Sequence, residues 1–316
     1  MTDKDKERGP GLMRKYVWVL YTILRHHKIS FRELNELWVD GDLSSGKDLP
    51  KRTFDNWCYA IEDIFDIDIE NEQGGDYRYY IKDEREFRRD ERRIWLFNTF
   101  NVINALGDCQ RIKDRILLEY IPSGEQHLQP IIDAMKEGRV LNITYQSYRN
   151  DEENDIKVQP YCVKLFKQRW YLVAKPDYAK AKPYIFSLDR ILSLHVADKT
   201  FQMPEGWSAK DYFKDSFGIF VDTKVKPRVV KLKVNAGQAN YIRDLRLHES
   251  QEEIERNQEY SIFRYWLRPQ FDFIQELLWH GGDVEVLEPI ELREDMTKII
   301  DSMWDNYHRE ENQTTN

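Results

Sequence analysis

The stretch that decides the fold reads QRWYLV at residues 168–173, and a second stretch, YIFSLDRI, follows at residues 184–191. Both are short runs of aromatic and branched residues, and turn-forming residues separate them, so they predict two neighbouring strands. In the first run Trp170 and Leu172 alternate with polar residues, which gives one apolar and one polar face. We expect Trp170 and Leu172 to lie in the core. The second run ends in two charges that a purely structural strand would seldom need.

Further strands surround these two runs. A helix is predicted first, at residues 128–137, and Gly138 supplies its C-terminal cap. Five short strands after one helix predict a small, strongly bent barrel of the Sm or SH3 type at residues 128–200. The predicted strands are residues 140–145, 156–163, 168–174, 184–188 and 191–196.

A chain of 316 residues is too long for one ordinary core and predicts two or three domains. Its hydrophobic content of 41% includes many aromatic residues, which is ample for packed cores. The formal net charge is -8 at pH 7. A strongly basic chain would have indicated nucleic acid, whereas here any DNA contact must come from the local placement of cations.

The three cysteines, Cys58, Cys109 and Cys162, lie far apart and form no Cys-x-x-Cys pair. The sequence therefore predicts neither a disulfide framework nor a metal site, and it carries no cofactor motif. Residues 1–10 are charged and lack the apolar core of a signal peptide. No run approaches the roughly 20 apolar residues of a membrane span. We expect a soluble, cytoplasmic protein with no membrane partner.

The N-terminal unit, residues 11–83, reads as three helices followed by a hairpin. Ser30 and Glu33 form the pattern of a capping box, which opens the second helix. Pro50 suits the start of the third helix, because its missing N–H is harmless there. This order is that of a winged helix-turn-helix, in which the third helix enters the major groove and the hairpin flanks the DNA backbone.

Six residues of this unit are the predicted contacts with double-stranded DNA. Cations at the start of the third helix can meet phosphates beside the positive end of the helix dipole, and polar residues further along can face base edges. A cation on the hairpin can touch phosphate or the minor groove. The six are Lys51, Arg52, Thr53, Asn56, Tyr59 and Arg78. The alternative is a protein-interaction module, since the same elements build such modules and acidic residues outnumber basic ones here.

A helical connector is predicted at residues 84–126. A dense run of mixed charges at residues 82–93 indicates a solvated helix face with i,i+4 ion pairs. The run continues into an apolar helix that ends at Gly107, and a second helix is expected at residues 111–119. A hydrophobic helical pair between domains serves as a dimerisation surface or as a rigid spacer.

Residues 201–226 are too aromatic to remain in water and predict an ordered linker. The C-terminal unit, residues 227–308, reads strand, helix, strand, strand, helix, strand and a final helix. Without the final helix this is the β-α-β-β-α-β order of a ferredoxin-like domain. The whole chain is therefore predicted to belong to the α+β class.

Four short motifs occur in order along the chain. They are Ile-Thr-Tyr at 143–145, Val-Gln-Pro at 158–160, Trp-Tyr-Leu at 170–172 and Leu-Asp-Arg-Ile at 188–191. In these motifs the chain resembles the bacterial WYL-domain transcriptional regulators, which take their name from the third motif. The resemblance implies an N-terminal DNA-binding module, a WYL barrel that receives an effector, and a C-terminal extension called WCX, assembled as a homodimer.

The resemblance also implies an effector site on one face of the barrel, for a nucleic acid, a nucleotide or another anionic ligand. It carries this role to Tyr145, Ser147, Tyr148, Lys157, Arg169, Tyr184, Ser187 and Arg190. Tyr184 and Ser187 stand where many relatives have arginines, so bidentate phosphate recognition is reduced here. A pocket that stacks a nucleobase and binds it through hydroxyl groups is an equal alternative. For Arg190 the alternative is an internal salt bridge with Asp189 or a neighbouring carboxylate.

No catalytic motif is found: the chain has no phosphate-binding glycine loop, no nucleophile elbow and no zinc-binding His-Glu-x-x-His helix. We therefore expect no enzyme and assign no catalytic residue. The main hypothesis is a transcriptional regulator, in which a homodimer binds an operator in duplex DNA and the barrel senses a nucleic-acid or nucleotide-like effector. The alternative is a single-stranded nucleic-acid-binding or scaffold protein that is not a transcription factor.

Overall fold

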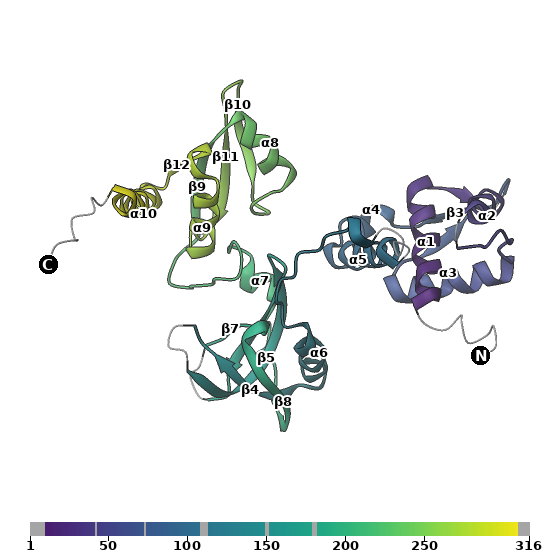
Figure 1. The fold of residues 1–316 in the computed structure, drawn as a ribbon, viewed down its shortest axis with the longest axis horizontal. Helices are drawn as coiled ribbons and strands as arrows, with labels where there is room; N and C mark the ends of the chain where they lie inside the picture. The colour runs from purple at the N-terminus through teal and green to yellow at the C-terminus, as the bar shows by residue number, and fades with distance from the viewer. Residues whose placement is uncertain are drawn as a thin grey trace. The chain divides into compact units, whose positions relative to one another are not determined.

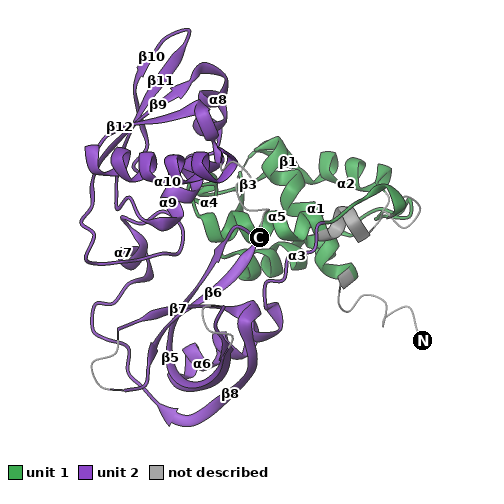
Figure 2. Ribbon diagram, turned by 60° about the vertical axis from the view of Figure 1, so that its left-hand side comes forward, with its two compact units in different colours: residues 1–118 green, residues 119–316 purple. Residues whose placement is uncertain are grey.

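The computed structural model describes residues 10–41, 43–72, 74–107, 113–148, 152–178 and 182–308. It divides into two compact units, residues 1–118 and 119–316, which Figure 2 distinguishes by colour. Figure 1 shows that helices and sheets occur in both units. The strands of the described sheets pair antiparallel. The predicted α+β class is therefore confirmed.

Unit 1 contains a small sheet with the strand order β1-β3-β2 and helices packed around it. The predicted three helices and hairpin are present. The sequence missed the two-residue strand β1, which pairs with β3. The elements are α1 (Pro10–His26), β1 (Ile29–Ser30), α2 (Phe31–Asp40), α3 (Lys51–Phe65), β2 (Ile69–Asn71), β3 (Arg78–Ile81), α4 (Glu84–Phe87) and α5 (Glu91–Gly107).

The start of α2 is set by the capping box that the sequence predicts. The Glu33 amide donates to Ser30 Oγ at 3.2 Å, and the Ser30 amide donates to the Glu33 carboxylate at 2.8 Å. A cap of this kind contributes about 1 kcal/mol. Pro50 is the residue that precedes the first turn of α3, where no amide hydrogen is needed.

Helix α3 has one apolar face, which lies in the core of unit 1 together with α1, α2 and β3. The ring of Trp57 meets Trp38 of α2 with centroids 5.5 Å apart, and that of Phe54 meets Tyr79 of β3 at 4.9 Å. Burial raises the pKa of the Cys58 thiol to about 12, so it remains neutral and unreactive. The opposite face of α3 points outward.

The connector differs from its prediction in two places. The run of mixed charges is two helices instead of one, because Asp90 caps the start of α5: its Oδ1 accepts the amides of Arg92 and Arg93 at 3.0 and 3.1 Å. Phe87 and Phe97 then pack in the core of unit 1.

The helix predicted at residues 111–119 is wrong over its described part. Only a short 3-10 turn, Lys113–Arg115, is present, and residues 116–124 form no regular element. Positions 111 and 112 lie outside the described residues. Leu117 is 92% exposed, and the apolar spacing alone did not stabilise a helix.

The first part of unit 2 contains helix α6 and a curved five-stranded sheet (Figure 2) whose strand order is β7-β6-β5-β4-β8. Helix α6 (Leu128–Glu137) ends as predicted at Gly138, which has a φ of 62°. Ile131 of α6 packs with Leu172 in the core of this sheet, and Trp170 lies at its margin. The strands are β4 (Arg139–Gln146), β5 (Glu153–Phe166), β6 (Arg169–Pro176), β7 (Tyr184–Ser187) and β8 (Ile191–Thr200).

The ordered linker contains a short helix, α7 (Ala209–Phe213), that the sequence did not predict. Phe201, Trp207 and Phe213 of the linker pack against Tyr161 and Val173 of the sheet. The aromatic residues of the linker therefore form a small second core, which explains why this segment is ordered.

The C-terminal part of unit 2 follows the predicted order of elements. Its sheet has the strand order β10-β11-β9-β12, and α8 and α9 bury Ile242 and Phe273 against it. Among the described helices none is both long and apolar enough to cross a membrane. The elements are β9 (Arg228–Asn235), α8 (Ala236–Asp244), β10 (Glu252–Arg256), β11 (Tyr260–Leu267), α9 (Phe271–Trp279), β12 (Val284–Glu288) and α10 (Ile290–His308).

Candidate functional site

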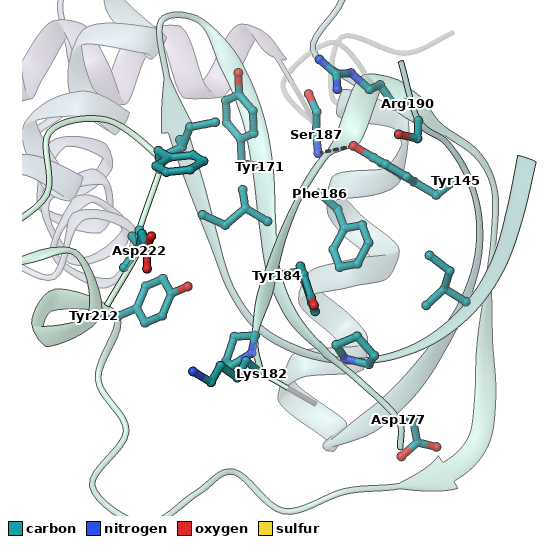
Figure 3. Close-up of a pocket in the computed structure, with 18 of the residues that line it drawn as sticks. Tyr145, Tyr171, Asp177, Lys182, Tyr184, Phe186, Ser187, Arg190, Tyr212 and Asp222 are labelled. Atoms are coloured by element: carbon teal, nitrogen blue, oxygen red, sulfur yellow. Dashed lines mark hydrogen bonds between the residues drawn. The ribbon is translucent and has the colours of Figure 1, made fainter. Parts of the chain in front are cut away.

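A cavity of about 1450 Å³ lies between the five-stranded sheet and the linker of unit 2, and we call it the main cavity. Strands β4 to β7 and the 3-10 turn Leu188–Arg190 contribute one wall. Tyr212 of α7 and residues 219–224 contribute the opposite wall. Figure 3 shows Tyr212 and Asp222 on one side and Tyr145, Ser187 and Arg190 on the other. Two separate segments of the chain thus build one site.

Aromatic side chains dominate the lining of the main cavity. They are Tyr145, Tyr148, Tyr171, Tyr178, Tyr184, Phe186, Tyr212 and Phe220. Burial raises the pKa of Tyr171 and of Tyr212, so both remain neutral phenols. Tyr148 and Tyr184 are 67% and 56% exposed, so part of each ring is accessible from solvent. Such rings can stack on a planar ligand, and every nucleobase has a face that suits them.

Tyr145 is held in place at the sheet end of the cavity. Its hydroxyl oxygen accepts a hydrogen bond from the Ser187 amide at 3.4 Å (dashed in Figure 3). Its ring meets Phe186 edge to face, with centroids 5.2 Å apart. Because neighbouring groups fix both ends of the ring, Tyr145 is a rigid part of the wall.

Arg190 carries the positive charge at the same end of the cavity. Its guanidinium lies 3.9 Å above the centre of the Tyr148 ring, a cation–π contact. The alternative of a salt bridge with Asp189 is not realised: Asp189 lies 3.5 Å from Arg169 and accepts from Ser187 Oγ. The Nε of Arg190 is buried and has no hydrogen-bond partner among the described residues. An arginine in this state is suited to receive an anion.

The charged residues that line the cavity, with Arg190 included, leave an excess of one positive charge. The cations are Lys157, Lys182, Arg190 and Lys224, and the acids are Asp155, Asp177 and Asp222. Asp177 is compensated from outside the cavity, because Lys199 donates to it at 2.6 Å and lowers the pKa of its carboxyl. Within the described residues no group of His, Cys, Asp and Glu side chains is arranged to hold a metal ion. The cavity therefore suits an aromatic anion.

Seven of the eight predicted effector-site residues line the main cavity, namely Tyr145, Ser147, Tyr148, Lys157, Tyr184, Ser187 and Arg190. Arg169 does not line it and contacts Asp189 instead. The sequence missed Tyr171 and the linker wall, including Tyr212 and Phe220. The high aromatic content of residues 201–226 was the one available signal for this wall.

A second surface lies on α3 of unit 1. Arg52, Asn56 and Tyr59 are exposed and follow one another at helical spacing, and Tyr59 is 71% exposed. The side chains of Arg52 and Asn56 make no hydrogen bond or ion pair with another described residue. Thr53 lies beside them, half-buried. These residues form an open polar stripe.

The other two predicted DNA contacts have partners within unit 1. Lys51 pairs with Asp55 and lies 5.1 Å from the centre of the Tyr79 ring. Burial lowers the pKa of Lys51, but its hydrogen bonds with Asp55 and Tyr79 outweigh this and raise it. Arg78 donates to Glu33 at 3.2 Å. Lys51 would have to break its ion pair with Asp55, and Arg78 its ion pair with Glu33, before either could bind a phosphate.

Comparisons with known families identify both parts of unit 2. The WYL domain family matches residues 126–196, which include the sheet wall of the main cavity, and the WCX domain family matches residues 226–304. The chain therefore contains a WYL domain followed by a WCX domain. Residues 219–224, the linker wall, fall between the two matches.

Two solved structures show a weak similarity to this chain. One is proteasome accessory factor B/C (PafBC) of Arthrobacter aurescens, which is 15% identical with a TM-score of 0.40 and covers 97% of this chain. The chain spans only 50% of that protein's length. Another is a CRISPR Cas-related protein, 15% identical with a TM-score of 0.38, where the match covers 83% of this chain and 74% of that one. No curated protein matches the chain.

Proposed function

We propose that the chain is an effector-responsive, DNA-binding transcriptional regulator. In this proposal unit 1 is a winged helix-turn-helix, α3 enters the major groove, and the hairpin of β2 and β3 flanks the DNA backbone. The order of the elements in unit 1 and the open stripe of Arg52, Asn56 and Tyr59 support this assignment. Arg52 would bind a phosphate or a guanine edge, and Asn56 would bind an adenine edge.

The two parts of unit 2 would then have different architectures. The five-stranded sheet of the WYL domain would be a small barrel of the Sm or SH3 type. The WCX domain would be a ferredoxin-like domain followed by one extra helix. Its element order β9-α8-β10-β11-α9-β12 and its strand order β10-β11-β9-β12 support this assignment.

The main cavity is the proposed effector site, and the observation that carries this is the state of Arg190. Its guanidinium lines the cavity, stacks on Tyr148 and pairs with no carboxylate among the described residues, which favours an anionic ligand. The aromatic lining adds a preference for a planar group. Together they favour a nucleotide or the end of a nucleic-acid strand.

Regulation would follow from coupling between the cavity and the DNA-binding units of a homodimer. An effector changes operator affinity only if it binds one arrangement of the dimer better than another. The proposal therefore requires that the effector and the operator influence each other's affinity, in whichever direction. It requires no chemical turnover, and we propose that the protein is not an enzyme.

The test begins with DNA. Purified full-length protein is mixed with fragments of its own genome, and the bound fragments are sequenced. We expect a duplex site with inverted repeats, bound by a dimer in light scattering. Nucleotides and short single strands are then titrated, and we expect at least one to change the affinity for that site. Selection of no duplex sequence would contradict the proposal.

A second candidate is a single-stranded nucleic-acid-binding protein that does not regulate transcription. The observation in its favour is a hollow beside α3 that is lined by Asp55, Glu62 and Glu70. These acids repel the phosphate backbone of a duplex at unit 1, which would leave the main cavity of unit 2 as the nucleic-acid site. A gel-shift comparison separates the candidates. Preference for single strands, with no selective duplex binding, would favour this second function, and metal-dependent cleavage of either substrate would indicate an enzyme.

A further inference from the structure

The linker wall of the main cavity is held by the C-terminal domain. Asp272 lies in the first turn of α9, and its Oδ2 accepts hydrogen bonds from the amides of Ile219 at 2.7 Å and Phe220 at 2.6 Å. A carboxylate that binds two successive amides fixes the path of the backbone at that point. The residues that follow, up to Lys224, line the cavity.

Neighbouring contacts strengthen the same attachment. Gln270 donates to the Asp222 carbonyl at 2.6 Å. The ring of Phe217 packs against Phe273 of α9, with centroids 5.7 Å apart. All of these partners belong to the start of α9 or to the residues just before it, so one end of one helix contacts residues 217–222 at four points.

The sheet holds the same segment from its own side. Lys164 of β5 donates to the Gly218 carbonyl at 2.5 Å, and its ammonium lies 3.9 Å from the centre of the Phe213 ring. Burial lowers the pKa of Lys164. The segment is thus fixed between the two domains and is attached to both.

Gly218 shows how closely the segment approaches α9. It has a φ of 76°, and a Cβ at this position would lie 2.5 Å from Asp272 Oδ2. A side chain would displace the carboxylate from the amides that it holds. The attachment therefore depends on a glycine and an aspartate that lie 54 positions apart in the sequence.

We propose that Asp272 is a positioning residue of the effector site: it holds Phe220 over the main cavity, where the ring stacks on the planar group of a nucleotide-like ligand. The site is then completed by the WCX domain, which gives that domain a role in ligand binding. The ring of Phe220 contacts Phe271 of α9, with centroids 6.2 Å apart, and the residue remains 44% exposed, so part of the ring is accessible to a ligand in the cavity. This inference rests on the proposed function of the cavity.

The test uses full-length protein and two probes, ATP and a 5′-phosphorylated single strand of five thymidines. The variants are Asp272→Asn, which keeps the size of the side chain, Phe220→Ala, and the double variant. Asp295→Asn is the matched control, because Asp295 pairs with Lys298 on the surface of α10 and contacts no linker residue that is described. Affinities are measured by calorimetry, and folding is checked by thermal denaturation.

We expect Asp272→Asn and Phe220→Ala each to weaken binding of a probe by about tenfold, with the double variant no weaker than either alone. Such non-additivity distinguishes positioning from general destabilisation, which would give additive losses. Hydrogen exchange at the Ile219 and Phe220 amides should rise in Asp272→Asn and fall when the probe binds to the natural protein. Gly218→Ala should weaken probe binding as Asp272→Asn does, because its Cβ would displace the Asp272 carboxylate. It replaces Asp272→Asn in the test if Asp272→Asn does not fold.

The outcomes separate the two proposals. If the natural protein binds neither probe, the proposed effector site fails and this inference fails with it. If the natural protein binds and Arg190→Ala does not, but Asp272→Asn binds as well as Asp295→Asn, only the role of Asp272 is overturned. Additive losses in the double variant would also overturn it.

Discussion

The edge of the WCX sheet and the main cavity each contain an arginine, and their surroundings are opposite. Arg243 of α8 uses its guanidinium fully: Nε donates to Glu253 at 2.9 Å, and one Nη donates to Glu253 at 2.7 Å and to Ser261 at 2.9 Å. The hydrogen bond from Arg243 is the main cause that lowers the pKa of Glu253 to about 2. This arginine is satisfied within its own domain.

Arg190 is in the contrasting state. It stacks on Tyr148, its Nε lacks a partner among the described residues, and the nearest acid in the sequence, Asp189, is engaged by Arg169 and Ser187. The comparison teaches that the type of residue does not distinguish a structural cation from a binding cation. The difference is that the fold places a carboxylate, Glu253, beside Arg243, whereas no carboxylate among the described residues pairs with Arg190.

The largest expected effect is the loss of effector binding in Arg190→Ala. Removing a charged hydrogen-bond donor from a ligand site should weaken affinity by roughly 10- to 100-fold, with operator binding unchanged. Calorimetric titration measures it. Arg169→Ala is the matched control and should bind the effector almost normally, because Arg169 lies outside the cavity lining. Unfolding of Arg190→Ala in a thermal melt would show instead that the residue is structural.

An effect of comparable size, but on DNA binding, is expected for a substitution on α3. Arg52→Ala should weaken operator binding by about 1–3 kcal/mol if the guanidinium touches a base, and should leave effector affinity unchanged. Fluorescence anisotropy at several salt concentrations measures the loss and the salt slope. Lys51→Ala should do less, because Lys51 already pairs with Asp55. A larger loss in Lys51→Ala than in Arg52→Ala would contradict this ranking.

A substitution of Arg243 should change the free energy of unfolding and leave effector affinity unchanged. Arg243→Ala leaves the half-buried Glu253 without its bidentate partner and should lower the free energy of unfolding by about 1–2 kcal/mol. Urea denaturation measures this. Effector affinity should stay at the natural value, since Arg243 does not line the main cavity. If Arg243→Ala changed effector affinity and left the free energy of unfolding unchanged, the assignment of Arg243 as structural and of Arg190 as ligand-binding would be contradicted.

The smallest effect is a dependence on acid pH. The pKa of Glu253 falls from an ordinary value of 4.5 to about 2 on folding, so its stabilisation is present above pH 4.5 and is lost as the pH falls towards 2. The pair is partly exposed, so solvent screening limits the effect to the order of 1 kcal/mol. Glu253→Gln should flatten the pH dependence of urea denaturation in this range, and an unchanged slope would contradict the assignment.

Local patterns predicted more than non-local ones. The capping box of Ser30 and Glu33 involves residues only three positions apart, so the sequence alone could predict it. The family resemblance assigned Tyr145 and Arg190 to one site, and both line the main cavity. The helix predicted at residues 111–119 was wrong over its described part, because apolar spacing alone does not stabilise a helix. The resemblance also assigned Arg169 to the site, but a short motif cannot show that the fold pairs this side chain with Asp189.

The sequence determined the class of the chain, its WYL and WCX domains and most of the sheet wall of the cavity, because periodicity, caps and motifs depend on residues a few positions apart. Only the tertiary structure decided which charges remain without a partner and that Asp272 holds a wall 52 residues earlier in the chain. The reason is physical: a charge is neutralised by whatever the fold brings within about 4 Å, and that neighbour need not be near in sequence.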